Sequence, residues 1–417
     1  MSEGEKSDGI SRRGLLVGGG LAGLGVAVGF ASAPRDSAPG AVTAADTSTV
    51  PFYGLHQAGI ATTVQDFLTF AAFDLNETAS STDLRDVLNS WSSAAALMTR
   101  GESLGFPTNN YDIPVDSGEA WGRPASALTV TIGYGASLYR DHPQLGLSAP
   151  ALLKDLPAFT GDDIDATISN GDIAVQVCAN DPQVAFHAVH TLARLGSGIV
   201  ALRYTQLGFG RTSSVNAQQE SARNLLGFKD GTNNLRSNAE SEFKHHVWVG
   251  RDASAPYMVA GTYLIARKIR TRLESWSNAP LSLQEETIGR FKVTGAPLSG
   301  TNENDTPDLG ALDGSGNQII PSSAHIRLAA PGSNGGAKIL RRGYGFSEGL
   351  DATTGEISCG LYFICFTSKP ESFIKIQENL ALNDALNNYT QHVSSTVIAC
   401  PGGLSRGFGW GDQLFGR

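Results

Sequence analysis

The chain of 417 residues predicts an α+β fold, with antiparallel sheets and helices on the outside, because it contains two similar halves. Each half holds an apolar strand, a turn, a proline suited to the first helical position, and then apolar residues at helical spacing. The first copy spans residues 171–192 around Pro182, and the second spans residues 359–380 around Pro370. This repetition indicates two related modules.

The remaining segments complete a β-α-β-β-α-β order in each half, which is the ferredoxin-like unit. The additional strands are expected at 62–75, 127–132 and 199–205 in the first half and at 261–273 and 395–400 in the second, with helices at 82–99 and 282–291. We therefore predict two ferredoxin-like modules packed together. Residues 1–45 form a leader and linker, 46–235 the N-terminal module and 236–417 the C-terminal module.

Two long segments separate these elements. Residues 101–126 are rich in Asn, Pro and Gly, and residues 299–318 are acidic and rich in Asp and Asn. The second segment is not an EF-hand, because residues 308–317 lack the ligand spacing and the terminal glutamate of that loop. It is predicted to be a solvated surface loop.

The N-terminal leader has the pattern of an export signal. Arg12 and Arg13 precede a weakly apolar, glycine-rich run that ends at small residues near Ala31 to Ala33. A twin arginine before such a run is typical of twin-arginine export, which carries folded proteins. The alternative is an uncleaved anchor, but the run is barely long enough to span a bilayer, which needs ~20 apolar residues. We expect export to the cell envelope or the medium, with the cleavage site left open.

The charge pattern excludes some classes of partner. The formal net charge is −9 and no run of basic residues is present. Nucleic acids and anionic membranes attract basic surfaces, so neither is an expected partner. The sequence leaves the oligomeric state open, including a homo-oligomer.

The four cysteines are expected to be buried free thiols, although an exported chain could pair them. Cys359 and Cys365 lie six residues apart on one predicted strand, which separates them by ~20 Å at ~3.3 Å per residue. A disulfide requires Cα atoms within ~7 Å, so these two cannot bridge.

Three short segments carry residues suited to peroxide chemistry. Gly227-Phe228-Lys229-Asp230-Gly231-Thr232 holds a carboxylate between glycines. Ala324-His325-Ile326-Arg327-Leu328 holds a histidine at the start of a short strand-like run, and Ile339-Leu340-Arg341-Arg342-Gly343 holds two arginines. A neutral imidazole is the usual axial ligand of haem. A carboxylate can move a proton between peroxide oxygens, and a fixed cation stabilises the charge that develops.

In this order the three segments resemble the dye-decolourising peroxidases, and the resemblance extends from Phe52 to Pro401. It includes His56, which matches a family signature without a catalytic role. The resemblance implies one haem b per chain, held in the C-terminal module. It also resembles the twin-arginine-exported branch, whose members are associated with iron uptake.

On the ligand side of the haem, the resemblance implies that His325 is the axial ligand of the iron. Asp384 matches the position of the carboxylate below that histidine, where it would accept the second imidazole N–H. Arg327 is expected to pair with a haem propionate.

On the peroxide side, the resemblance implies that Asp230 is the proton shuttle. Arg341, rather than Arg342, is favoured as the charge stabiliser, and Leu361 and Phe363 share a strand face as an apolar wall. Some relatives have an asparagine two residues after this arginine, where this chain has Gly343.

The sequence contains two other candidate sites. His187 and His190 lie three residues apart on one helix and would supply only two metal ligands. Ser347 lies in a G-x-S-x-G sequence, but a hydrolase elbow needs a helix after the serine, and here a turn at 351–355 is expected.

The function implied by the resemblance is oxidation of bulky dyes and phenolic compounds by hydrogen peroxide. The alternative is a haem-binding, iron-releasing protein that works with components of an iron-uptake system. A haem carrier has no need of an Asp–Arg pair opposite the ligand, so that pair favours the peroxidase.

Overall fold

The computed structural model describes residues 49–416 except 112, 216–219 and 353. The predicted leader therefore lies outside the described residues. Residues 46–417 form one compact unit. Among the described residues, the helices all lack the combination of length and apolar character that a membrane span requires.

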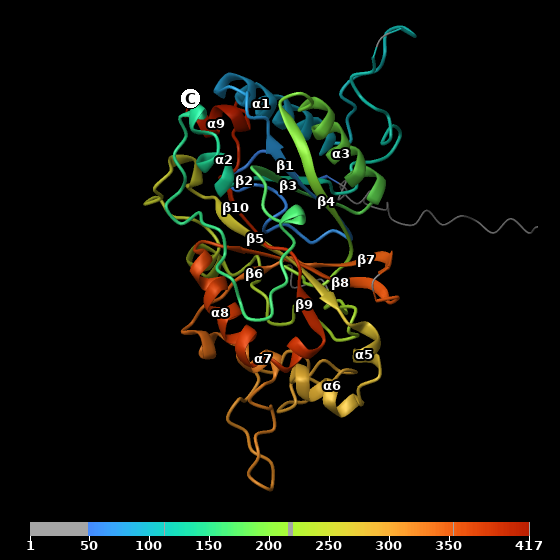
Figure 1. Ribbon diagram of the computed structural model, residues 1–417, viewed down its shortest axis with the longest axis vertical. Coiled ribbons are helices and arrows are strands. Elements are labelled where there is room, and N and C mark those ends of the chain that lie inside the picture. The colour runs from blue at the N-terminus through green and yellow to red at the C-terminus, as the bar shows by residue number, and fades with distance from the viewer. Residues whose placement is uncertain (1–48, 112, 216–219, 353, 417) are drawn as a thin grey trace, which may run out of the picture. The chain divides into compact units, whose positions relative to one another are not determined.

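The first module contains the predicted β-α-β-β-α-β order, and it occupies the upper part of Figure 1. Its elements are β1 (Phe67–Leu75), α1 (Ser81–Met98), β2 (Thr129–Gly135), β3 (Ile173–Ala179), α3 (Pro182–Leu195) and β4 (Val200–Arg211), with α2 (Ala136–Arg140) and the 3-10 turns η1 (Pro143–Leu145) and η2 (Ala166–Ile168) between them. Ser80 and Asp83 form a capping box that starts α1. Pro182 is the first residue of α3, as predicted, and Asp181 caps it.

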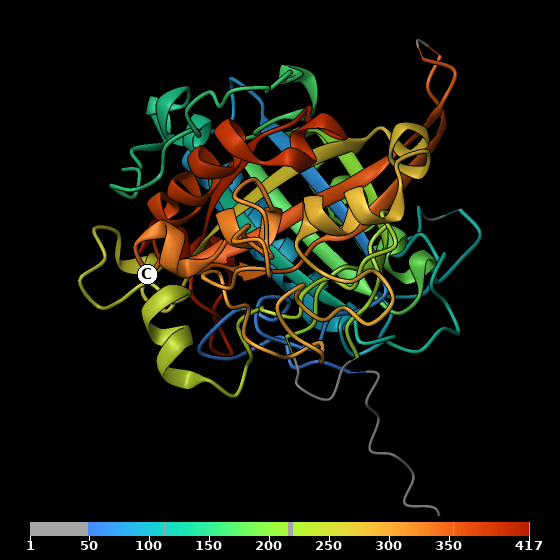
Figure 2. The same cartoon turned by 90° about the horizontal axis from the view of Figure 1, so that it is seen from below.

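The second module repeats this order with more inserted helices. Its elements are α4 (Glu240–His246), η3 (Pro256–Met258), β5 (Thr262–Thr271), α5 (Leu273–Ser277), α6 (Leu281–Ile288), α7 (His325–Leu328), η4 (Pro331–Asn334), β6 (Leu340–Arg341), β7 (Tyr344–Leu350), β8 (Ile357–Thr367), α8 (Pro370–Asn383), η5 (Ala385–Asn388), β9 (Thr390–His392), β10 (Thr396–Cys400) and α9 (Trp410–Phe415). Pro370 begins α8, as predicted. Helices α5 to α8 lie in front of the strands when the molecule is seen from below (Figure 2).

The two antiparallel sheets join at both edges. Strand β4 pairs with β7, and β2 pairs with β10. Since β5 also pairs with β8, the strands β8, β7, β4, β1, β3, β2, β10 and β5 form a closed circuit of hydrogen-bonded neighbours. Two ferredoxin-like sheets packed together therefore enclose a shared interior. The predicted module boundary at residue 235 falls between β4 and α4 and stays a prediction.

Apolar clusters lie on both sides of this closed sheet. The inner cluster contains Phe70, Tyr344, Tyr362 and Phe366. One outer cluster lies beneath α1, α3 and α9, and another lies beneath α8. Burial on both faces explains why β2 and β3 are buried along their whole length.

The cysteines, Ser347 and His325 lie in segments for which the sequence makes specific predictions. All four cysteines are free and buried, as predicted. Ser347 lies inside β7, which turns back at Asp351 into the antiparallel strand β8, so the hydrolase elbow is absent from this segment. The strand-like run at His325 is wrong: the segment is the helix α7, because Ala324 begins a turn whose carbonyl accepts from Arg327 and Leu328.

Candidate active site

His325 and Asp384 form a partly buried pair on the helical side of the second module. Nδ1 of His325 lies 2.6 Å from Oδ2 of Asp384. The Asp384 side chain is 3% exposed, whereas 32% of the His325 side chain is exposed. Burial lowers the pKa of His325, but the Asp384 carboxylate more than offsets this and raises it above its ordinary value. With Nδ1 engaged, Nε2 is the nitrogen that remains for a metal ion.

Helix ends hold this pair in place. His325 is the first residue of α7, and Asp384 ends α8, where its Oδ1 accepts from the backbone N–H of Leu386. The amide of Asn379 on α8 donates to the carbonyl of Leu328 at the end of α7. The two helices are thereby fixed against each other, and the carboxylate orients the imidazole.

Asp230 and Arg341 form a second pair. Nη1 of Arg341 lies 2.9 Å from Oδ1 of Asp230, and both side chains are largely buried. The charge of Asp230 raises the pKa of His325 and the charge of Arg341 lowers it, so both charges lie near the imidazole. The structure thus brings the predicted shuttle, the predicted cation and the predicted ligand together.

The loop that carries Asp230 requires its two glycines. Gly227 and Gly231 have φ of +84° and +79°, in the left-handed region that favours glycine. A Cβ on Gly231 would also lie 2.6 Å from the Cα of Ser213. Between them, Phe228 is buried against Trp276, whose indole N–H donates to the carbonyl of Leu226. The loop is therefore rigidly anchored on both sides of the carboxylate.

Asn224 is a site residue that sequence reasoning missed. Its side-chain amide donates to Oδ2 of Asp230 at 3.1 Å, and its Oδ1 accepts from the backbone N–H groups of Leu226 and Phe228. At Gly343, where some relatives have an asparagine, a Cβ would lie 2.9 Å from Oγ1 of Thr212. In this chain the amide that contacts the carboxylate comes from Asn224. Nothing in the sequence distinguishes Asn224 from an ordinary turn residue.

Strand alternation separates the two arginines. Arg341 pairs with Cys365, and its backbone is held by both polar atoms of the Asn234 side chain. Arg342 points to the opposite face, where it is fully buried and donates to the carbonyls of Thr62 and Thr63. Of these two arginines, only Arg341 therefore lies beside Asp230.

Leu361 and Phe363 are placed on the face that Arg341 occupies. They alternate along β8 with Tyr362 and Ile364, which belong to the inner cluster. Both are partly exposed, and Phe363 packs against Phe373 of α8. An apolar wall on the outer face of β8 is consistent with this arrangement.

Glu303 connects the predicted surface loop to the Asp230 loop. Its carboxylate accepts from Lys229 and from Thr232, which flank Asp230 in the sequence. The Glu303 side chain is only 18% exposed. Burial raises its pKa, but the hydrogen bonds from Lys229, Ser221 and Thr232 outweigh this and lower it. The start of segment 299–318 therefore packs against the loop that carries Asp230. Sequence reasoning missed this contact.

Two further predicted residues have structural partners. Nε and Nη2 of Arg327 both donate to the carbonyl of Ile320, and Nε also donates to the carbonyl of Pro321. Nη1 is the nitrogen that remains for another group. His56 stacks on Trp248 at 3.7 Å, and its Nδ1 lies 2.7 Å from the carbonyl of Ala260. His56 thus ties the start of the described chain to the second module.

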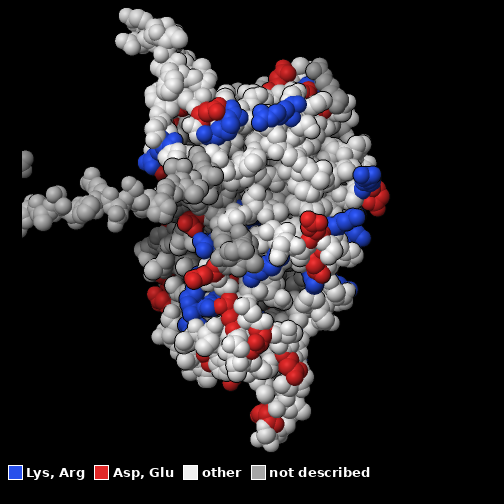
Figure 3. All heavy atoms as spheres, turned by 180° about the vertical axis from the view of Figure 1, so that it is seen from behind, with Lys and Arg blue, Asp and Glu red and all other residues white. Residues whose placement is uncertain are grey.

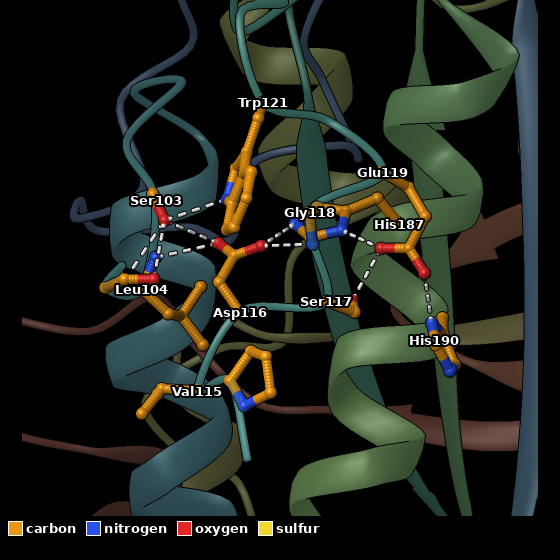
Figure 4. Close-up of polar contacts among 12 residues, drawn as sticks. Ser103, Leu104, Val115, Asp116, Ser117, Gly118, Glu119, Trp121, His187 and His190 are labelled. Carbon is orange, nitrogen blue, oxygen red and sulfur yellow. Dashed lines mark hydrogen bonds and ion pairs between the residues drawn. The ribbon is translucent and has the colours of Figure 1, made fainter. Parts of the chain in front are cut away.

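His187 and His190 both contact Glu119. Nδ1 of His187 lies 2.8 Å from Oε2 of Glu119, and Nδ1 of His190 lies 2.7 Å from Oε1 (Figure 4). Asp116 lies next to His187. Among the described residues, no group of three or more His, Cys, Asp or Glu side chains is arranged to hold a metal ion. The two histidines instead fasten segment 101–126 to α3.

The surface charge agrees with the sequence. On the face seen in Figure 3, basic and acidic side chains are interspersed and no broad basic surface is visible.

A histidine–carboxylate pair near an aspartate–arginine pair, on a doubled ferredoxin-like fold, is the arrangement expected of a haem peroxidase. Comparison with known proteins specifies which one. The profile of the Dyp-type peroxidase N-terminal domain matches residues 57–210, and that of the C-terminal domain matches residues 221–405. The chain belongs to the Dyp-type peroxidase family. It is therefore an oxidoreductase that uses a haem cofactor and hydrogen peroxide.

Several relatives resemble the chain over nearly its whole length. It is 34% identical to the deferrochelatase of Escherichia coli strain K12, with 94% of each chain covered. It is 35% identical to ferric DtpA from Streptomyces lividans, with a TM-score of 0.81 and coverage of 88% of this chain and 97% of that one. A DyP-type peroxidase from Streptomyces coelicolor also has 35% identity and a TM-score of 0.81, with 89% and 98% covered.

Proposed function

We propose that haem b binds between the two pairs, with Nε2 of His325 as the protein ligand of its iron. The donor set supports this, because Asp384 already occupies Nδ1 and fixes the tautomer that leaves Nε2 free to bind metal. Replacing His325 with Ala should abolish the absorption spectrum of histidine-ligated haem. If that spectrum persists, and disappears instead when His56 or His392 is changed, the ligand is assigned wrongly.

When bound, the haem iron supplies the redox centre at which the peroxide O–O bond is cleaved. We assign the proton movements to Asp230, which takes a proton from one peroxide oxygen and returns it to the other. Arg341 donates hydrogen bonds to the oxygen on which negative charge develops. The observation that carries this proposal is the contact between Nη1 of Arg341 and Oδ1 of Asp230, on the same site as His325.

The test is the rate at which the resting enzyme reacts with hydrogen peroxide, followed by the change in haem absorption. General acid–base groups contribute ~10²–10⁴-fold, and a lost oxyanion donor costs ~10²–10³-fold. We expect losses in these ranges for Asp230→Asn and for Arg341→Leu. Arg342→Leu is an unsuitable control because Arg342 is buried, so Arg270→Leu, on β5, serves instead. If both site variants react as fast as the parent, neither residue has the proposed role.

For the reducing substrates we propose bulky aromatic dyes and phenolic compounds. Family membership supports a reductant, and the apolar side chains of Leu361 and Phe363 suit aromatic surroundings. Steady-state oxidation of an anthraquinone dye and of a simple phenol, compared with an inorganic reductant, tests this choice. Turnover confined to the inorganic reductant would exclude it.

A second candidate is iron release from haem, as part of an iron-uptake system. It is supported by the similarity to proteins named deferrochelatase, which covers 94% of the chain. The Asp230–Arg341 pair favours the peroxidase, because releasing iron requires no peroxide chemistry. Incubation of the haem-loaded protein without peroxide, followed by mass spectrometry for iron-free protoporphyrin, separates the two activities.

For localisation we propose export by the twin-arginine route. The support is sequence alone: Arg12, Arg13 and the glycine-rich run that follows. The mature protein should accumulate outside the cytoplasm with haem bound, and changing both arginines to lysine should block this. Normal secretion of the double variant would exclude the twin-arginine route.

A further inference from the structure

His187 on α3 lies between two carboxylates of segment 101–126, as Figure 4 shows. Its Nδ1 lies 2.8 Å from Oε2 of Glu119, and its Nε2 lies 3.8 Å from Oδ1 of Asp116. The imidazole and the Asp116 carboxylate are both buried, with side-chain exposures of 5% and 1%. A neutral imidazole carries a proton on one nitrogen and a charged one on both, so the ring can donate to both carboxylates only when it is charged.

The two contacts of this ring therefore respond differently to its protonation. The contact with Glu119 needs a proton only on Nδ1, which the neutral ring can carry. Nε2 of that neutral ring then presents a lone pair to Asp116, and 3.8 Å is too long for a hydrogen bond. A second proton, on Nε2, replaces two facing acceptors with a charge-assisted contact between an imidazolium and a carboxylate. The contact with Asp116 is thus the one that depends on pH.

His187 is the cation available to Asp116. The Asp116 carboxylate accepts from the hydroxyl of Ser103 and from two backbone N–H groups, which are all neutral donors. Among the described residues, Asp116 and Glu119 form ion pairs with histidines only. Burial raises the pKa of Asp116, but its hydrogen bonds and the positive charge of His187 outweigh this and lower it. Since a buried carboxylate without a counter-charge is costly, the charge on His187 affects how firmly the segment is held.

Segment 101–126 lies over the outer apolar cluster beneath α1 and α3. Met98, Leu128 and Val184 are buried there and, with His187 and Trp121, line a cavity of about 150 Å³. The other charged groups near His187 each have a partner of their own: His190 with Glu119, Arg123 with Asp181, Arg100 with Glu102, and Arg194 with the carbonyls of Pro114 and Val115.

We propose that His187 is a pH-sensitive switch, which holds segment 101–126 on α3 when both ring nitrogens are protonated and loosens it when Nε2 loses its proton. Histidine is the side chain whose charge ordinarily changes between about pH 5 and 8. The added stabilisation is present at the acidic end of this range and is lost as the pH rises, because the imidazolium is the form that contacts Asp116. The Nδ1 contact with Glu119 persists, so the segment stays attached but opens more often. The switch uses none of the residues assigned to haem.

Amide hydrogen exchange of the haem-loaded protein between pH 5 and 8, corrected for the intrinsic pH dependence of exchange, tests the switch. Losing a hydrogen bond to a charged group should lower the protection of peptides from segment 101–126 by about 10- to 100-fold as the pH rises. Peptides from β3 should change little over the same range, which separates local opening from unfolding of the module.

His187→Gln removes the titrating group, so the protection of the segment should be low and independent of pH. His190→Gln is the matched control, because His190 lies on the same helix and contacts Glu119 through Nδ1, with no carboxylate at its Nε2 among the described residues. It should keep most of the pH dependence of the parent. Asp116→Asn removes the carboxylate and should also abolish the pH dependence, which guards against a folding defect in His187→Gln. Protection that does not vary with pH in the parent, or an unchanged pH dependence in His187→Gln, would overturn the proposal.

Discussion

Asn224 donates its side-chain amide to Oδ2 of Asp230 at 3.1 Å, on the side of the carboxylate opposite Arg341. The backbone N–H of Gly231 also donates to Oδ1. Both oxygens of the predicted proton shuttle are therefore held before peroxide arrives. This preorganisation means that the orientation of Asp230 depends on a residue six positions earlier in the chain.

Replacing Asn224 with Asp should impair the reaction with peroxide and move its pH dependence. The new Oδ1 still accepts from the Leu226 and Phe228 amides, so the loop keeps its turn, but a second carboxylate now faces Asp230. Two carboxylates that share a site resist ionising together. The pH below which the peroxide reaction slows, because Asp230 is protonated, should therefore move upward. Stopped-flow absorption measures the rate of this reaction as a function of pH. Asn302→Asp, in the 299–318 segment, is the control, and an unchanged pH profile in Asn224→Asp would contradict the assigned contact.

Removing the Glu303 carboxylate should loosen the Asp230 loop. Glu303→Ala deletes the acceptor shared by Lys229 and Thr232, and a misplacement of ~1 Å costs up to ~10²-fold in rate. We expect a slower peroxide reaction and faster amide hydrogen exchange in the peptide around 229–232. Asp313→Ala, in the same segment, removes only contacts within that segment and should change neither. The effects of Lys229→Met and Glu303→Ala should be non-additive, because both remove the same ion pair.

Replacing Asp384 with Asn should weaken the hold on haem. The carboxylate accepts the Nδ1 proton of His325, and the loss of such an outer partner typically costs ~10–100-fold in metal affinity or activity. A less basic imidazole also stabilises ferric iron less, so the reduction potential should rise. Spectroelectrochemistry and haem transfer measure the two effects. Glu378→Gln, an exposed change on the same helix, should leave the reduction potential and haem transfer at parent values. Parent values in Asp384→Asn would show that Asp384 has no role in the site.

Low pH should weaken the contact of Glu119, in segment 101–126, with His187 and His190 of α3. Burial raises the pKa of Glu119, but hydrogen bonds from Ser117, His187 and His190 outweigh this and leave it at about 2. Because the folded pKa is depressed below its ordinary value of 4.5, this carboxylate stabilises the fold fully above pH 4.5. Its contribution is lost as the pH falls from 4.5 toward 2.

Urea denaturation of the parent and of Glu119→Gln at several pH values checks this prediction. The difference in the free energy of unfolding should be largest above pH 4.5 and should close as the pH approaches 2. Glu286→Gln, an exposed change on α6, should show no such dependence. If the difference in the free energy of unfolding grows as the pH falls, the predicted stabilisation by the Glu119 carboxylate is wrong.

Much of the fold could be predicted from local sequence because its signals are local. The prolines at 182 and 370 begin α3 and α8 as predicted. Hydrophobic periodicity located most of the strands, but β7 (Tyr344–Leu350) was not predicted. Boundaries were less accurate: β4 extends to Arg211, beyond the predicted end at 205, because pairing with β1 and β7 prolongs it. His325 was expected on a strand, and a four-residue helix is too short for periodicity to reveal.

The sequence by itself determined the family and the residue types at the site, since three short motifs in order are enough to identify a chemistry. Only the tertiary structure decided which side chains meet. Strand register sends Arg341 and Arg342 to opposite faces and aligns Arg267 with Phe363. Loop packing brings Asn224 to Asp230 and Glu303 to Lys229. These contacts join residues from 6 to more than 90 positions apart, and no local pattern encodes them. They depend on how the closed sheet and its loops pack, which is a property of the whole chain.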